Sequence, residues 1–320
     1  MSLLRQLEHD FVAVTERAAR AAAQTMGYGD GEHCDRVAAE AMREALERLA
    51  AAGRVAIAEA ESEERTTLRV GDAGDGVEVD VAVDPLEGAR LCATGAPGAV
   101  SVLAAAERGG LLAVPDVYME KIMVGPTARG AVHLDSPVPE NLRNVARSLG
   151  REVSDLTVVV LDRERHRQLV ADIRDTGARI RLIAEGELSA GIAAAVRGTG
   201  VHAVMGVGRA PAGVIAAAAL RCLGGEIQAR LVAVDEEQKK RLAEHGFPDA
   251  GRVLATEELA RGESIVFSAT GVTDGEFLRG VRFFGGGSRT STLVMSLPER
   301  LVRFTETIHL EDPTIPVQFY

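Results

Sequence analysis

The 320-residue sequence predicts a layered α/β protein, and two observations indicate this fold class. In the second half of the chain, short apolar runs typical of strands alternate with longer segments whose apolar residues recur at helical spacing. The first half begins with two such helical segments, and several strand-like runs follow them. Alternation of this kind is typical of right-handed crossover connections that pack helices against a sheet.

The first half is predicted to hold two helices and then five strands. Apolar residues at helical spacing place the helices at Leu3–Thr25 and Val37–Ala52. The predicted strands are Arg54–Ala58, Glu78–Val83, Val100–Ala106, Leu111–Val114 and Lys121–Val124. A turn-rich stretch from Pro126 to Pro139 follows. We therefore expect two halves, residues 1–135 for metal and phosphate binding and residues 136–320 for sugar binding, with the C-terminal strands in the second.

In the second half, predicted strands and helices alternate until three strands end the chain. The alternating strands are Thr157–Leu161, Arg179–Ile183 and His202–Val207. The helices are Arg165–Thr176, Leu188–Val196, Ala212–Cys222 and Asp235–His245. The last three strands are Ser264–Ala269, Thr290–Ser296 and Val302–His309. A chain of this length is long enough to bury a sizeable core.

Composition and charge exclude several classes of partner. The net charge of −11 argues against nucleic acids and anionic membranes, although a bound cation can reverse the local field for a phosphorylated substrate. The three cysteines are too few and too widely spaced for a disulfide framework or a zinc site, which favours a reducing cytoplasm. Residues 1–10 are rich in charge, so no signal peptide is expected, and the apolar runs are too short for a membrane span.

The most informative motif is Asp84-Pro85-Leu86-Glu87-Gly88, which follows the apolar run Val79–Val83. We expect Pro85 to end the strand and Gly88 to permit a tight turn. Two carboxylates three residues apart then sit at a strand end, and carboxylate oxygens are the ligands that a hard cation such as Mg²⁺ prefers. The alternative interpretation is a strand-to-turn junction whose acids are solvated.

Further acids upstream strengthen the metal interpretation. Asp35 opens a helical pattern, so it is either the N-cap of that helix or a metal ligand. Glu59, Glu61 and Glu63 alternate after the short apolar run Val55–Ala58. In an extended chain this spacing puts their side chains on one face, although a solvated acidic loop is the alternative.

A pair of arginines indicates a second anion site. Arg163 and Arg165 alternate just after the predicted strand Thr157–Leu161. They could clamp a distal phosphate, because guanidinium geometry matches phosphate oxygens. A solvated loop is the alternative for this pair.

Six further segments carry a resemblance that runs nearly end to end. They are Phe11–Glu16, Asp80–Gly88, Pro115–Lys121, Glu140–Ala146, Gly213–Ala218 and Phe267–Thr273. In this order they resemble the class II fructose-1,6-bisphosphatases, which belong to the lithium-sensitive, metal-dependent sugar and inositol phosphatase superfamily. The resemblance implies an α-β-α-β-α sandwich and hydrolysis of a sugar phosphate ester, foremost fructose 1,6-bisphosphate, with Mg²⁺ or Mn²⁺. We expect a cytoplasmic homodimer or homotetramer.

The resemblance also implies roles for individual residues. The metal carboxylates match Asp35, Glu59, Asp84 and Glu87. Glu63 matches the acid that activates the attacking water. The substrate-facing positions match Gly88, Ala89, Tyr118, Arg163, Arg165, His166, Glu185, Glu187 and Gly208.

Several positions depart from the pattern of the family. Ala89 stands where the active loop has threonine, Gly31 where a lysine precedes the first metal aspartate, and Ala212 where a further acid binds metal. Two function classes therefore stay open. One is a slowed or re-specialised phosphatase, and the other is a relative that binds sugar phosphate without hydrolysing it. The four retained metal carboxylates favour the phosphatase.

Overall fold

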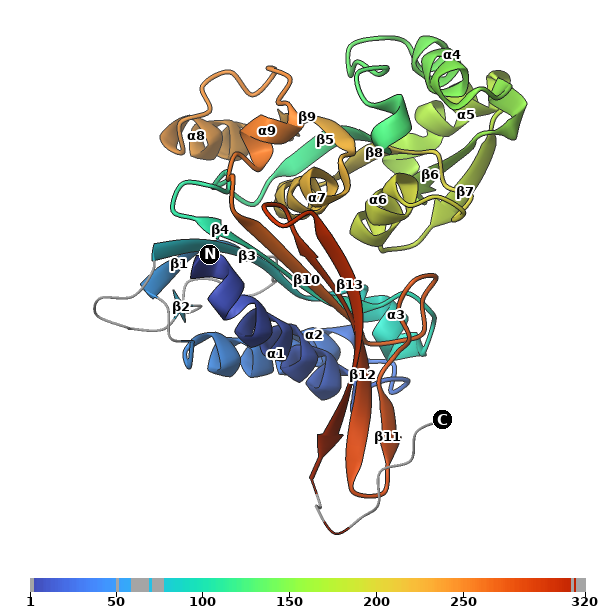
Figure 1. Cartoon of the computed structure of the whole chain (residues 1–320). Helices are drawn as coiled ribbons and strands as arrows, with labels where there is room; N and C mark the ends of the chain where they lie inside the picture. Colours follow the sequence, from blue (N-terminus) through green and yellow to red (C-terminus); the bar gives the residue numbers. More distant parts are fainter. Residues whose placement is uncertain (1–2, 50–51, 59–68, 71–77, 312–313, 315–320) are drawn as a thin grey trace.

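The computed structural model describes residues 3–49, 52–58, 69–70, 78–311 and 314, and these residues form alternating layers of helices and sheets (Figure 1). The layers are α1 (Leu3–Ala23) with α2 (Gly31–Leu46), the first sheet, α6 (Glu187–Ala195) with α7 (Ala210–Leu223), the second sheet, and α4 (Val138–Leu149) with α5 (Arg167–Asp175). This arrangement confirms the α-β-α-β-α sandwich that the sequence predicts.

The first sheet has eight strands in the described residues. Their bounds are β1 Ala52–Ala58, β2 Arg69–Val70, β3 Glu78–Glu87, β4 Val100–Glu107, β10 Ile265–Gly271, β11 Arg282–Phe284, β12 Gly287–Ser296 and β13 Leu301–Leu310. The order is β11-β12-β10-β4-β3-β1-β2, and β13 pairs with β12. Only β1 and β3 are parallel among the described pairs. Buried side chains of α1 and α2, including Phe11 and Met42, pack on one face of this sheet against Val81 and Leu103.

The second sheet has five strands, in the order β7-β6-β8-β5-β9. Their bounds are β5 Tyr118–Val124, β6 Thr157–Leu161, β7 Arg179–Ile183, β8 Ala203–Arg209 and β9 Glu226–Val232. β6 runs parallel to β7 and β8, whereas β5 runs antiparallel to β8 and β9. The remaining helices are α3 Ala89–Thr94, α8 Glu236–Glu244 and α9 Thr256–Leu259, with 3₁₀ turns at Pro126–Ala128, Val153–Asp155 and Glu164–His166.

Helix α7 lies between the two sheets and contacts strands of both. Every residue from Ala210 to Leu220 is buried, and seven of these eleven residues are alanine or glycine. A helix that is covered on all sides needs no polar face, and small side chains let both sheets approach it. The sequence motif Gly213–Ala218 is therefore explained by packing.

The sheets do not follow the predicted boundary near residue 135. Strand β5 precedes that boundary and belongs to the second sheet, while β10 to β13 return to the first sheet and pair next to β4. The reason is that β10 aligns antiparallel with β4 and completes its hydrogen bonding. The functional division into two halves stays a prediction, but the C-terminal strands join the layer that carries Asp84 and Glu87.

Three local expectations are corrected. Pro85 does not end its strand, because β3 continues to Glu87 with a register shift between Asp84 and Glu87. The run Leu111–Val114 forms only an isolated bridge from Leu111 to Ala260. Helix α4 and strand β9 were not expected from the sequence.

The start of α2 also differs from the expectation. The helix begins at Gly31, and its N-cap is Asp30, whose side chain accepts a hydrogen bond from the His33 amide. Asp35 therefore lies inside the helix, and the capping interpretation of Asp35 is wrong. Within the described ranges, we find no helix that is both long and apolar enough to cross a bilayer.

Candidate active site

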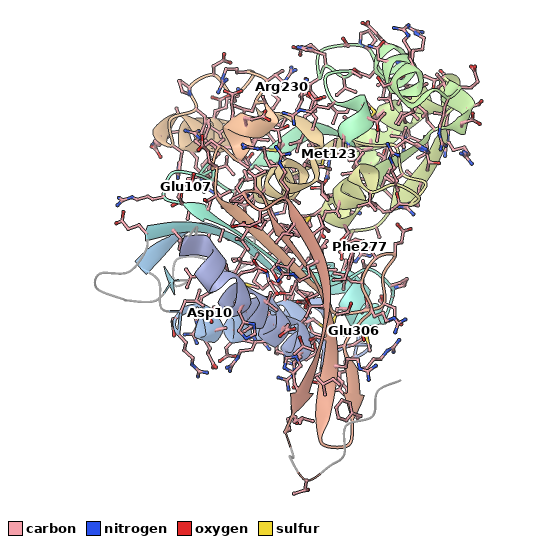
Figure 2. All side chains as sticks on the ribbon, viewed as in Figure 1. Asp10, Glu107, Met123, Arg230, Phe277 and Glu306 are labelled. Atoms are coloured by element: carbon pink, nitrogen blue, oxygen red, sulfur yellow. The ribbon has the colours of Figure 1, made fainter. Side chains whose placement is uncertain are left out.

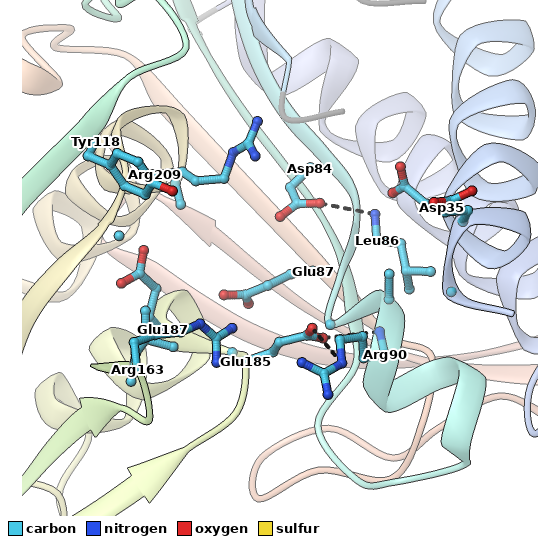
Figure 3. Close-up of a pocket in the computed structure, with 18 of the residues that line it drawn as sticks. Asp35, Asp84, Leu86, Glu87, Arg90, Tyr118, Arg163, Glu185, Glu187 and Arg209 are labelled. Carbon is cyan, nitrogen blue, oxygen red and sulfur yellow. Dashed lines mark hydrogen bonds and ion pairs between the residues drawn. The ribbon is translucent and has the colours of Figure 1, made fainter. Parts of the chain in front are cut away.

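A cavity of about 510 Å³ brings most of the predicted site residues together (Figure 3). The predicted residues that line it are Asp35, Asp84, Glu87, Gly88, Ala89, Tyr118, Arg163, Arg165, Glu185, Glu187 and Gly208. Gly31 and Ala212, which depart from the family pattern, line the same cavity. The predicted Glu59 and Glu63 lie outside the described residues. The cavity wall thus combines elements of both sheets.

The turn after β3 is built around Gly88. This residue has φ 92°, in the left-handed region, and is the N-cap of α3. A Cβ atom at Gly88 would lie 3.0 Å from Leu91 Cδ1 and 3.3 Å from Ala99 Cα. Glycine is therefore needed here both for its backbone angle and for space. The turn places Ala89 as the first residue of α3, at the cavity wall.

The carboxylates of the motif are buried and hydrogen-bonded to backbone. Asp84 Oδ1 accepts from the Leu86 amide at 3.1 Å. Glu87 Oε1 accepts from the Leu188 amide at 2.8 Å, and Oε2 accepts from Ser189 Oγ at 3.2 Å. Glu87 therefore joins the end of β3 to the first turn of α6, where the helix dipole favours a negative charge.

The donor chemistry of this wall fits a hard divalent cation. Asp35, Asp84 and Glu87 offer carboxylate oxygens to one cavity, and such oxygens are what Mg²⁺ and Mn²⁺ bind. Among the residues that the structure describes, no three His, Cys, Asp or Glu side chains are close enough to form a complete cation site. The convergence of these carboxylates with Glu59 on one cation cluster stays a prediction.

Glu185 and Glu187 both bind protein groups. Glu185 Oε2 accepts from the Arg90 amide at 3.1 Å. Glu187 Oε1 accepts from Lys121 Nζ at 2.6 Å, and the Lys121 side chain is only 2% exposed. A Cβ atom at Gly208 would lie 2.1 Å from Glu187 Oε1, so glycine at this position leaves room for the buried ion pair.

Both arginines of the predicted pair line the same cavity as the turn, and Figure 3 labels Arg163 there. Arg165 Nε and Nη2 both donate to the Val207 carbonyl, at 3.0 and 2.8 Å. Its guanidinium carbon lies 5.1 Å from the centroid of the Tyr118 ring, within cation–π range. Arg163 Nη1 donates to the Asp162 carbonyl at 3.0 Å. Because Arg165 is held on two sides, it presents a fixed positive charge.

The predicted His166 is buried and is not among the residues that line this cavity, so its role toward substrate stays a prediction. His166 Nε2 accepts a hydrogen bond from the Val207 amide at 2.8 Å. Nδ1 lies 2.7 Å from the Leu161 carbonyl, to which it donates. His166 joins the end of β6 to β8 and thereby positions the loop that carries Arg163 and Arg165.

Two arginines that the sequence did not single out also line the cavity. Arg90 follows Ala89 on α3, and Arg209 ends β8. The signal that could have found Arg209 is its place at a strand-to-helix junction beside Gly208, because ligands gather at the carboxyl ends of strands.

Two of the three cysteines pack beneath the turn. Cys34 of α2 and Cys92 of α3 are buried in one apolar cluster, and all three cysteines are free thiols. Burial raises the pKa of the Cys92 thiol to about 12, so this side chain is neutral at physiological pH. These residues serve packing below the cavity.

Comparisons with known proteins agree with this geometry. A family model described as bacterial fructose-1,6-bisphosphatase, glpX-encoded, matches residues 5–309. A relative from Synechococcus sp. (strain JA-3-3Ab) is 48% identical, with 96% of each chain covered. Relatives from Synechococcus elongatus (strain ATCC 33912 / PCC 7942 / FACHB-805) and Gloeobacter violaceus (strain ATCC 29082 / PCC 7421) are 43% and 41% identical, each over 95% of this chain and 96% of the relative. All three are named D-fructose 1,6-bisphosphatase class 2/sedoheptulose 1,7-bisphosphatase.

The match spans the turn, the acids and the arginines of the cavity alike. The protein is an enzyme, a phosphoric monoester hydrolase that acts on a sugar phosphate. Phosphatases of this class depend on a divalent cation, which suits the carboxylates of the cavity. The chain belongs to the bacterial fructose-1,6-bisphosphatase family.

Proposed function

We propose that this enzyme removes the 1-phosphate of fructose 1,6-bisphosphate and uses Mg²⁺ or Mn²⁺ to do so. One observation carries the proposal. A single cavity is lined by the Gly88 turn, by the acids Asp84 and Glu87, and by Tyr118 with Arg165. In Figure 3 Tyr118 lies across from Asp84 and Glu87, and the Arg165 guanidinium lies against the Tyr118 ring. A bisphosphate with a phosphate at each end of a sugar matches this division of charge.

Hydrolysis of a phosphate monoester needs neutralised phosphoryl oxygens, a positioned water and a stabilised leaving oxygen. When bound, a divalent cation supplies positive charge to the phosphoryl oxygens and to the leaving oxygen. Asp35, Asp84 and Glu87, with the predicted Glu59, would hold it. The backbone amides of Gly88 and Ala89 would donate to the phosphoryl group, and Glu63 is proposed to accept the proton of the attacking water.

We propose that the part of the cavity lined by Tyr118 and Arg165 binds the rest of the substrate. Arg165 offers a guanidinium fixed by Val207 and Tyr118, which suits the 6-phosphate. The relatives' names include sedoheptulose 1,7-bisphosphatase activity. That sugar carries the same 1-phosphate end and a terminal phosphate one carbon farther away. We propose that the present enzyme accepts it as a second substrate.

Phosphate release from a panel of sugar phosphates, with Mg²⁺ and then with Mn²⁺, tests the proposal. We expect fructose 1,6-bisphosphate to lose one phosphate and to stop at fructose 6-phosphate, and EDTA to abolish the release. Sedoheptulose 1,7-bisphosphate should behave in the same way. If neither bisphosphate releases phosphate with either cation, the proposal fails and a binding protein is favoured.

Ala89→Thr is expected to raise kcat by about 10-fold, because a hydroxyl at the first residue of α3 can orient the attacking water. KM should change little, since the backbone amides of the turn are unchanged. Steady-state kinetics with fructose 1,6-bisphosphate checks this. Loss of activity in Ala89→Thr would contradict a slowed phosphatase and indicate re-specialised chemistry.

We further propose that the enzyme works in the cytoplasm as a homodimer or homotetramer, with a phosphorylated sugar as its partner rather than a nucleic acid or a membrane. The net charge of −11 supports the choice of partner, and the free cysteines support the cytoplasm. Light scattering coupled to size exclusion measures the oligomeric state, and a monomeric mass would contradict it.

A further inference from the structure

We infer that Arg209 binds the phosphoryl group that is cleaved, an inference that rests on the proposed function and names a further substrate-binding residue. Arg209 is the last residue of β8 and the N-cap of α7. In Figure 3 its side chain extends from the Tyr118 side of the cavity toward the side where Asp84 lies. Its guanidinium therefore extends toward the side of the cavity that holds Asp84.

The backbone of Arg209 is firmly held. Lys121 Nζ donates to the Arg209 carbonyl at 3.0 Å while it also binds Glu187. The next amide, that of Ala210, donates to the Val117 carbonyl at 2.9 Å. Strand pairing places Arg209 opposite Tyr118. A side chain on so fixed a backbone can be aimed at one place in the cavity.

Asp116 aims the side chain of Arg209. Arg209 Nη2 donates to Asp116 Oδ2 at 2.8 Å, and both side chains are about one-third exposed. A guanidinium carries five N–H donors in a planar fork, so it can bind a carboxylate and phosphate oxygens at the same time. Asp116 lies in the loop before β5 and restricts the rotation of the fork.

Electrostatic repulsion explains why a positively charged side chain is useful on this side of the cavity. Asp84 and Glu87 repel the oxygens of an entering phosphoryl group, and the positive charge of the Arg209 guanidinium offsets that repulsion. Ala212, three residues farther along, lines the same wall without charge. The other three cavity arginines contact different groups, namely Val207 for Arg165, the Asp162 carbonyl for Arg163 and Glu185 for Arg90.

Binding of inorganic phosphate in the presence of Mg²⁺, measured by calorimetry, tests this inference on the whole enzyme. Arg209→Gln should weaken phosphate binding by about 10-fold or more, the usual scale for a lost charge-assisted hydrogen bond. Arg209→Lys should recover part of the loss. Arg129→Gln, which removes a guanidinium paired with Glu257 outside the cavity, should stay within about twofold of wild type.

Fructose 6-phosphate provides a second readout, because it has only the remote phosphate. Arg209→Gln should leave its affinity unchanged, whereas Arg165→Gln should weaken it. If Arg209→Gln binds inorganic phosphate as wild type does and only the melting temperature falls, Arg209 is structural and the inference is overturned. Should Arg209→Gln not fold, Asp116→Asn, which loosens the aim of the guanidinium, must still weaken phosphate binding, and an unchanged affinity overturns the inference.

The two hypotheses fail in different ways. Wild-type hydrolysis of fructose 1,6-bisphosphate together with normal phosphate binding by Arg209→Gln overturns the inference and leaves the proposed function standing. Weakened phosphate binding in Arg209→Gln, with no hydrolysis by wild type, supports Arg209 as a phosphate-binding residue of this cavity and overturns the proposed function.

Discussion

Glu87→Gln is expected to lower kcat by about 10³-fold or more while the protein still folds. The substitution removes a carboxylate charge that the cation needs, and electrostatic groups of this kind carry much of the rate enhancement in such sites. It keeps the shape of the side chain and one carbonyl oxygen that can still accept from the Leu188 amide. Steady-state kinetics and a thermal melt of the same sample separate the two effects.

Ser189→Ala is the matched control for Glu87→Gln. It removes the hydroxyl that donates to Glu87 Oε2 and leaves the carboxylate in place. We expect its kcat to stay within a few fold of wild type. If Glu87→Gln also keeps more than about a tenth of the wild-type kcat, Glu87 serves only to join β3 to α6, and its assignment as a metal ligand is wrong.

Lys121→Met is expected to lower the free energy of unfolding by about 3–5 kcal/mol. The methionine fills much of the volume of the lysine, but it leaves the Glu187 carboxylate mostly buried without its cation. The Arg209 carbonyl also loses its hydrogen bond from Lys121. Figure 2 shows Met123, two residues farther along the same strand, where β5 passes α7. Urea denaturation measures the loss.

Two further variants define the cause of that loss. Lys121→Met combined with Glu187→Gln should recover a large part of the stability, because no buried charge then lacks a partner. Lys239→Met removes an ion pair of the same 2.6 Å length, but Lys239 and Glu236 are exposed. Its urea midpoint should not change measurably. A stability loss of equal size in Lys121→Met and Lys239→Met would contradict the role of burial.

Local sequence predicted much of the fold. The alternation of apolar runs gave β6, α5, β7, α6, β8 and α7 in the correct order, with ends shifted by a few residues. Periodicity reports which face of an element is buried, so it predicts the type of element well. It failed at Leu111–Val114, where four apolar residues form only a bridge, because strand formation also needs a partner along its length.

For the candidate site, too, one part could be predicted from the sequence and another part could not. The turn at Gly88 follows from local sequence, since only glycine fits its backbone angle and its contacts with Leu91 and Ala99. The sequence resemblance also assigned Asp35, Tyr118 and Arg165 to one site, and all three line the same cavity. Residue type and sequence motif were enough to predict these residues as members of the site.

Only the tertiary structure decided which groups pair across the site. Glu87 binds the amide of Leu188 at a separation of 101 residues, and Arg209 binds Asp116 at a separation of 93. It also decided that His166 is buried between β6 and β8, where it bonds to the backbone of Leu161 and Val207. The sequence by itself determined the family, the turn and the type of most elements, because motifs and apolar periodicity lie within short segments of the chain. Long-range pairs depend on how two sheets meet around α7, which no local pattern encodes.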